Sequence, residues 1–149
     1  MACGSGKTLT AHWINQFLKF NKTLVFVPSL YLLTQFYKDW YKQSHVEDIK
    51  INFLLIGSNA DINDEEMNLN ANKINIFTDQ NAIKKYLITV KADEKIVVIS
   101  TYQSAEILAG SCKKIKFEFD FGIFDEVERI YRVDYNYKIS HNNFIYPIP

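Results

Sequence analysis

The stretch Thr23-Leu24-Val25-Phe26-Val27 is short, unbroken and apolar, and Pro28 stops it. A strand with this pattern is typical of a parallel sheet, in which both faces of each strand are buried. Ser29 follows the proline and can cap a helix, which we expect over residues 31–42. The residues that would line one face of that helix are Leu32, Phe36 and Trp40.

The same alternation of strand and helix continues on both sides of this unit. Further strands are expected over residues 51–56, 74–77, 96–100 and 117–124. Further helices are expected over residues 6–20, 79–90 and 102–109, and Thr78-Asp79 can cap the second of them. Strands that alternate with helices predict an α/β fold with an open, mostly parallel sheet and right-handed crossovers.

The helix expected over residues 6–20 carries an apolar stripe. Leu9, Trp13 and Phe17 fall at positions i, i+4 and i+8, and Ile14 and Leu18 lie on the adjoining rows. This spacing is that of an amphipathic helix.

Composition limits the classes of protein that the chain can belong to. It has 149 residues, of which 48% are hydrophobic and 23% charged, so we expect one globular domain. Seventeen basic residues balance seventeen acidic ones, so the chain as a whole is not a strongly basic nucleic-acid-binding protein. A local strip of basic residues that binds nucleic acid stays possible. Cys3 and Cys112 cannot form a disulfide scaffold or a four-thiolate zinc site. No long apolar run or secretory signal is present, so we expect a cytoplasmic protein without a membrane span.

Three kinds of segment stand apart from the alternating pattern. Residues 58–72 contain four acidic residues and no basic one, which indicates a solvated acidic loop. Residues 127–149 are aromatic and polar with weak periodicity. Lys84-Lys85 and Lys113-Lys114-Lys116 are short basic clusters, which fit either a solvated face or an edge that binds nucleic acid.

Gly4-Ser5-Gly6-Lys7-Thr8 is the core of a P-loop, directly before the first expected helix. Glycines let backbone N–H groups turn toward a triphosphate, and the helix that follows adds the positive end of its dipole. In such a loop Lys7 would bind the β and γ phosphates, and the hydroxyl of Thr8 would bind Mg²⁺. The alternative is a chance capping sequence. A P-loop normally follows a buried strand, and no residue precedes Met1 to form one, so we expect the first strand to be missing.

The last expected strand ends in two acids, Asp125 and Glu126. At the carboxyl edge of a parallel sheet, Asp125 would hold Mg²⁺ and Glu126 would orient or deprotonate the attacking water. The alternative is a helix N-cap, because acidic residues are common where a strand leads into a helix. A P-loop upstream, with strand–helix units between, favours the functional interpretation.

Four segments, in order, resemble known motifs. They are residues 1–11 around the P-loop, residues 24–35 (Leu-Val-Phe-Val-Pro-Ser-Leu-Tyr-Leu-Leu-Thr-Gln), residues 97–104 (Val-Val-Ile-Ser-Thr-Tyr-Gln-Ser) and residues 119–126 (Phe-Asp-Phe-Gly-Ile-Phe-Asp-Glu). Together they resemble motifs I, Ia, the Thr-Tyr-Gln-Ser motif and motif II of the first RecA-like domain of superfamily 2 helicases. The DEAD/DEAH-like helicases related to restriction-enzyme translocase subunits are the most similar. The resemblance implies a RecA-like three-layer fold, of which residues 1–149 would be a partial domain.

The resemblance also implies a function and roles for individual residues. Gly4, Ser5, Gly6, Lys7 and Thr8 would bind ATP, and Asp125 and Glu126 would serve Mg²⁺ and the attacking water. Pro28, Ser29 and Thr101 fall on motifs that usually contact the nucleic-acid backbone, and hydroxyl groups at strand ends fit that role. Helix capping is the alternative for Ser29 and Thr101. The implied partners are DNA or RNA and a second RecA-like domain or partner subunit.

The chain departs from the motifs in three respects. Motif II reads Asp125-Glu126-Val127-Glu128, where the family has His or Asp at the fourth position. No Ser-Ala-Thr motif follows within the 149 residues, and we expect the second RecA-like domain, with its arginine fingers, to be missing. Two functions of different classes therefore stay open: the ATPase motor fragment of a helicase or translocase, and a truncated, non-catalytic remnant that binds nucleotide weakly or docks on a partner. A P-loop kinase fits less well, because no lid of arginines is visible.

Overall fold

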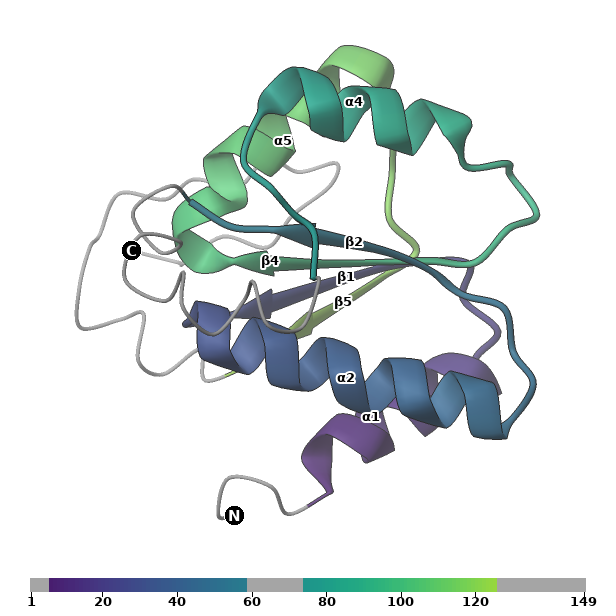
Figure 1. Ribbon diagram of the computed structural model, residues 1–149. Coiled ribbons are helices and arrows are strands. Elements are labelled where there is room, and N and C mark those ends of the chain that lie inside the picture. The colour runs from purple at the N-terminus through teal and green to yellow at the C-terminus, as the bar shows by residue number, and fades with distance from the viewer. Residues whose placement is uncertain (1–5, 59–73, 126–149) are drawn as a thin grey trace, which may run out of the picture.

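The computed structural model describes residues 6–58 and 74–125, which form a three-layer α/β fold (Figure 1). Helices α1 (Lys7–Phe17) and α2 (Leu30–Val46) cover one face of the sheet, and α4 (Gln80–Thr89) and α5 (Ala105–Ile115) cover the other. The strands are β1 (Lys22–Val27), β2 (Asn52–Ile56), β3 (Ile76–Phe77), β4 (Ile96–Thr101) and β5 (Phe121–Phe124). A 3₁₀ turn, η2 (Tyr102–Ser104), joins β4 to α5.

The sheet has the strand order β3-β2-β4-β1-β5, and every pairing is parallel. Val25 of β1 lies between Ile99 of β4 and Ile123 of β5. The α/β class and the parallel sheet predicted from the sequence are therefore confirmed. In such a sheet all carboxyl ends meet at one edge, which is where sites form in this architecture.

Strand β1 is buried on both faces, as its unbroken apolar run predicts. Leu24 and Phe26 join the core under α4 and α5, whereas Val25 and Val27 join the core under α2. Each of these four side chains is at most 2% exposed. The alternation follows from the two-residue period of a strand.

Two of the predicted helix caps are confirmed. The hydroxyl of Ser29 accepts a hydrogen bond from the Leu32 N–H at 3.3 Å, and the carboxylate of Asp79 accepts one from the Ala82 N–H at 2.9 Å. These bonds satisfy N–H groups that have no partner within the first turn of a helix. Helix α2 buries Phe36 and Trp40 as predicted. The third buried side chain is that of Leu33, whereas the predicted Leu32 is only half-buried.

Most predicted elements have different bounds from the observed ones; α2, for example, continues to Val46 instead of ending at residue 42. The helix expected over residues 102–109 starts as η2 and continues as α5 to Ile115, because Leu108, Ser111 and Cys112 extend its buried stripe. The strand expected over residues 117–124 is β5, which starts only at Phe121. Its partner β1 begins at Lys22, so earlier residues have no strand beside them to pair with.

Helix α1 differs most from its prediction. Its predicted apolar stripe points away from the protein: Trp13, Ile14, Phe17 and Leu18 are 51%, 44%, 84% and 48% exposed. The side chains that it buries are those of His12 and Asn15. Both have polar partners, because His12 Nε2 lies 3.0 Å from Glu47 Oε2 and Asn15 Oδ1 accepts a hydrogen bond from the Thr23 hydroxyl at 2.7 Å. None of the helices described in these two segments has the length and apolar run that crossing a bilayer requires.

Glu47 fastens α1 to the end of α2. Its carboxylate accepts hydrogen bonds from Gln43 at 2.7 Å and from the Trp13 indole at 3.0 Å, besides its contact with His12. The hydrogen bonds from Gln43 and His12, then that from Trp13, hold the pKa of this carboxyl below its usual value. Glu47 thereby adds stability that is present above the pKa of the unfolded carboxyl and is lost as the pH falls through the lower folded value.

Glu47→Ala is expected to lower the free energy of unfolding by about 1–3 kcal/mol at neutral pH, since it leaves the buried His12 ring without its partner. Urea unfolding at neutral and acidic pH measures this effect, and the difference from the unsubstituted chain should shrink toward acid. Glu118→Ala, at an exposed position, is the matched control. An equal loss at both pH values would contradict the assigned role.

Candidate functional site

Gly6, the one glycine of the predicted P-loop among the described residues, is the N-cap of helix α1. Gly6 has φ 85°, and a Cβ added there would meet nothing within 4 Å. Because a positive φ strains any residue with a side chain, glycine is the residue that fits this backbone conformation best. Lys7 is the first residue of the helix and is exposed. Gly4 and Ser5 lie outside the described residues.

Trp40 of α2 holds the first turn of α1 in place. Its indole N–H donates a hydrogen bond to the backbone carbonyl of Thr8 at 2.8 Å. The ring is fully buried, and its centroid lies 5.0 Å from that of His12, edge to face. The position of Thr8 therefore depends on a side chain 32 residues further along the chain.

Asp125 follows the last residue of β5, and its backbone is fixed on both sides. Its N–H donates to the Phe26 carbonyl at 2.9 Å, and its own carbonyl accepts a hydrogen bond from the Tyr102 hydroxyl at 2.9 Å. The Tyr102 ring in turn stacks on Phe26, with centroids 5.4 Å apart. Glu126 lies outside the described residues.

Tyr102 is a positioning residue that the sequence-based prediction missed. It belongs to the Thr-Tyr-Gln-Ser segment, in which only Thr101 was singled out. Its ring and hydroxyl join that segment to the end of β5. An aromatic residue directly after a buried strand was the available signal, but its partner lies 23 residues away.

The predicted convergence of Lys7 and Asp125 is not seen as a contact. Within residues 6–58 and 74–125, no hydrogen bond or ion pair joins these two side chains. The Thr8 hydroxyl and the Asp125 carboxylate likewise make no hydrogen bond in this part of the chain, so both oxygens are available for a ligand. A common site formed by these residues therefore stays a prediction.

Of the three residues predicted to contact nucleic acid, Ser29 and Thr101 have internal roles in the described structure. Ser29 caps α2 and is half-buried. Thr101 is fully buried, and its hydroxyl donates to the Ser104 hydroxyl at 3.2 Å. The exposed side chain of this segment is Gln103, whose amide oxygen accepts a hydrogen bond from the Ser58 hydroxyl at 3.4 Å. A ligand at this edge would therefore meet Gln103 before Thr101.

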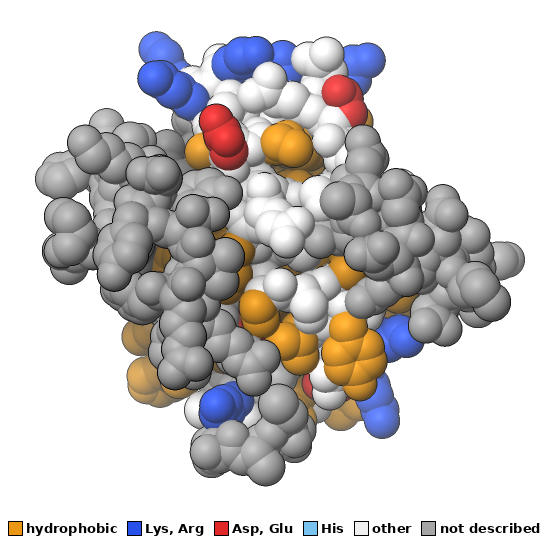
Figure 2. All heavy atoms as spheres, turned by 90° about the vertical axis from the view of Figure 1, so that its left-hand side faces the viewer, with side chains coloured by type: hydrophobic (Ala, Val, Ile, Leu, Met, Phe, Trp, Pro, Cys, Tyr) orange, Lys and Arg blue, Asp and Glu red, His pale blue; other side chains and the backbone are white. Residues whose placement is uncertain are grey.

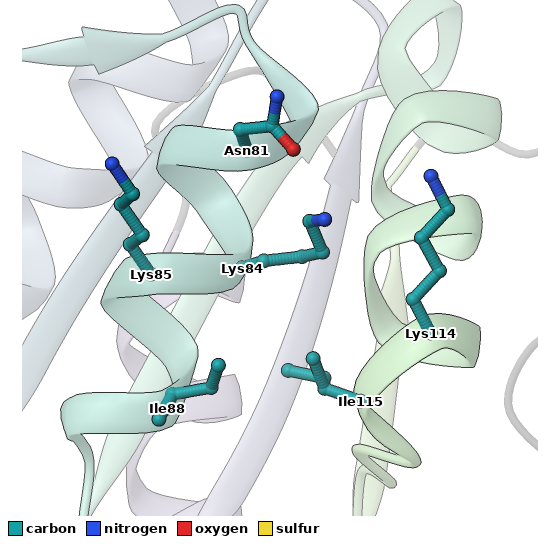
Figure 3. A pocket seen from close by; sticks show the side chains of 6 residues that line it. All are labelled: Asn81, Lys84, Lys85, Ile88, Lys114 and Ile115. Atoms are coloured by element: carbon teal, nitrogen blue, oxygen red, sulfur yellow. The ribbon is translucent and has the colours of Figure 1, made fainter.

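The two lysine clusters meet at a groove between α4 and α5. The groove has a volume of about 370 Å³ and is lined by Asn81, Lys84, Lys85, Ile88, Lys114 and Ile115. Figure 3 shows Lys84 pointing toward α5, with Ile88 and Ile115 facing each other at the far end. Figure 2, which looks onto the left-hand side of Figure 1, shows blue lysine side chains along its top edge, on the side of the sheet that α4 and α5 cover. Lys114 donates to the Gln80 side chain at 3.0 Å, so one of the three amines already has a partner.

The described residues offer neither a reactive cysteine nor a cluster of side chains that could bind a metal ion. Cys112 is a free thiol in the core, and burial raises its pKa to about 12, so it is not a reactive thiolate. Residues 6–58 and 74–125 contain no cluster of three or more His, Cys, Asp or Glu side chains that could hold a metal ion.

Comparison with known proteins places the chain in a family. A family model described as Type III restriction enzyme, res subunit, matches residues 1–146. The chain belongs to this family. No match was found among curated proteins. Among solved structures, a nuclease-deletion mutant of the Type ISP restriction-modification enzyme LlaGI, in complex with a DNA substrate mimic, is similar.

This chain and the LlaGI structure share 28% sequence identity, with a TM-score of 0.62. The match covers 85% of this chain and 10% of that chain, so this chain spans about a tenth of its solved relative. Together with the parallel sheet, this likeness confirms the RecA-like fold. The predicted resemblance to restriction-enzyme translocase subunits is confirmed too, and it supports a helicase-like, ATP-binding motor domain.

Proposed function

We propose that this chain is part of the motor domain of a DNA translocase and binds ATP with Mg²⁺ between the start of α1 and the end of β5. The observation that carries the proposal is the family match over residues 1–146, which spans both motifs. The left-handed Gly6 at the start of α1 and the fixed backbone of Asp125 after a parallel strand support it.

The residues fit the groups that they would bind. Backbone N–H groups of the loop that includes Gly4, Ser5 and Gly6 would surround the phosphates, with Lys7 as the cation beside them. The Thr8 hydroxyl and the Asp125 carboxylate are hard oxygen donors, which Mg²⁺ prefers. When bound, Mg²⁺ neutralises charge on the phosphates. Glu126 would orient the attacking water and accept its proton.

Hydrolysis and movement along nucleic acid require further parts. In this proposal a second RecA-like domain or a partner subunit completes the site from the opposite side of the nucleotide. DNA is the favoured polymer over RNA, because the solved relative is in complex with a DNA substrate mimic. Ser29, Thr101 and the exposed Gln103 would lie on the side of the carboxyl edge that faces the DNA. The proposed localisation of the protein is cytoplasmic.

Calorimetric titration with Mg·ATP tests the proposal. We expect the unsubstituted chain to bind Mg·ATP weakly, because residues 1–149 would supply one side of the proposed site. Lys7→Ala should weaken binding at least about tenfold, since it removes a charged hydrogen-bond donor. Lys38→Ala, at an exposed position of α2, is the matched control and should bind like the unsubstituted chain.

Equal heats from all three proteins would contradict nucleotide binding at Lys7 and favour the alternative of a non-catalytic remnant. Turnover of ATP by this chain alone is expected to be negligible. Robust turnover without a partner would contradict the need for a second domain.

A further inference from the structure

The two short lysine clusters belong to different helices but meet at one groove. Lys84 and Lys85 are part of α4 and Lys114 is part of α5, and all three line the groove between these helices. The six described residues that line it include no acidic one. Among the residues that the structure describes, none of the three amines forms an ion pair. The groove therefore carries positive charge that would attract an anion.

Contacts at the start of α4 fix its spacing from α5. The Ser111 hydroxyl donates to the backbone carbonyl of Gln80 at 3.3 Å, and Lys114 donates to the Gln80 side chain at 3.0 Å. A Cβ on Gly110 would collide with the Gln80 side chain, so this glycine lets the two helices approach closely. The two helices that carry the lysines are therefore held at a defined distance from each other.

The start of α4 lies at the carboxyl edge of the sheet, because the helix closely follows β3. The N–H of Gly57, just after β2, donates to the carbonyl of Phe77, the last residue of β3, at 3.1 Å. The Ser58 hydroxyl then donates to the exposed Gln103 at 3.4 Å. The end of the groove at Asn81, near the start of α4, therefore lies beside the edge along which DNA is proposed to bind.

The polar and apolar side chains of the groove lie at opposite ends. Figure 3 shows Lys85 and Lys114 extending toward the end at Asn81, whereas Ile88 and Ile115 lie at the other end. The positive end of the α4 dipole adds to the charge at the Asn81 end. DNA is favoured over an acidic protein partner, because the isoleucines that such a partner would also contact lie away from the carboxyl edge.

We propose that Lys84, Lys85 and Lys114 form a second contact with the DNA phosphate backbone, beyond the carboxyl edge that Gln103 occupies. The inference rests on the proposed function, because it takes DNA as the polymer. Lysine amines attract phosphates as point charges, so this contact would hold the DNA in place without reading its bases. The chain has a formal net charge of zero, so a local strip of this kind must supply the attraction.

Fluorescence anisotropy of a labelled DNA duplex, titrated with the full chain at a low and a moderate salt concentration, tests the contact. The groove variant combines Lys84→Gln, Lys85→Gln and Lys114→Gln. It should bind the duplex at least about tenfold more weakly at low salt. The slope of log K against log salt should become shallower by up to about 3, because each lysine that contacts a phosphate contributes about 1.

The matched control replaces three exposed lysines outside the groove, by Lys38→Gln, Lys42→Gln and Lys50→Gln. It removes the same total charge as the groove variant, so it should keep most of the affinity and of the salt dependence. Circular dichroism reports whether each variant is folded. Equal losses in the two triple variants would overturn the proposal, since only the total charge would then matter.

Gln103→Ala separates this inference from the proposed function. A loss of affinity in Gln103→Ala but not in the groove variant would overturn the second contact and leave DNA at the carboxyl edge. A loss in the groove variant alone would support the second contact and contradict the proposed edge. An unsubstituted chain that does not bind the duplex would contradict both, while the Mg·ATP titration would still test the nucleotide site.

A polyglutamate peptide, titrated in the same way, tests the other class of partner. The duplex should bind the unsubstituted chain more tightly than this peptide does. Tighter binding of the peptide, lost in the groove variant, would assign the groove to an acidic protein partner and overturn the proposal.

Discussion

Replacing Trp40 by alanine is expected to lower the free energy of unfolding by about 3–5 kcal/mol, the range for a large aromatic side chain removed from a core. Trp40 is fully buried, packs on Phe36 with centroids 5.2 Å apart and contacts the edge of His12. It also donates its indole hydrogen bond to Thr8. The substitution would therefore create a cavity and release α1 from α2.

Chemical denaturation followed by circular dichroism measures this loss. Trp40→Phe separates the two contributions, because it keeps most of the ring and removes the N–H group. It should cost less than alanine, with about 1 kcal/mol from the hydrogen bond to Thr8. A loss below about 1 kcal/mol for Trp40→Ala would mean that α1 and α2 are not held together by this residue.

Phe26→Ala is expected to have a stability effect of similar size, about 3–5 kcal/mol, and a second effect on the proposed nucleotide site. The Phe26 ring is fully buried between Tyr102, at 5.4 Å, and Phe124, at 5.7 Å between centroids. Its backbone carbonyl accepts the N–H of Asp125. Loss of the ring would free Tyr102 and Phe124 and loosen Asp125, so Mg·ATP binding should weaken as well.

Tyr102→Phe is the control that separates these effects. It keeps the stacked ring but removes the hydroxyl that donates to Asp125, so stability should fall by only about 1 kcal/mol. If the position of Asp125 matters for the nucleotide, Mg·ATP binding should still weaken in this variant. Normal Mg·ATP binding by both Phe26→Ala and Tyr102→Phe, under conditions in which each variant is folded, would place Asp125 outside the site.

Local patterns in the sequence predicted much of the fold. The apolar run at β1, the caps at Ser29 and Asp79, and the strands β2 and β4 each depend on interactions within a few residues or on burial of both strand faces. The glycine at position 6, within the predicted P-loop, was predictable for the same reason, since its positive φ is a local backbone requirement.

The prediction failed where the deciding partner is distant in sequence. Periodicity gave α1 an apolar inner face, but Glu47, 35 residues after His12, supplies a polar partner that allows His12 to be buried instead. Likewise, β5 starts at Phe121 because β1 starts at Lys22, about a hundred residues earlier. No window of the sequence around either element contains this information.

The sequence by itself determined the α/β class, the parallel strands and the two motifs that point to a nucleotide, because these depend on local periodicity and residue chemistry. Only the tertiary structure decided which face α1 buries, that Trp40 holds Thr8, and that Tyr102 and Phe26 fix the backbone of Asp125. The physical reason is that a buried polar group is stable only beside a partner, and folding alone brings those partners together.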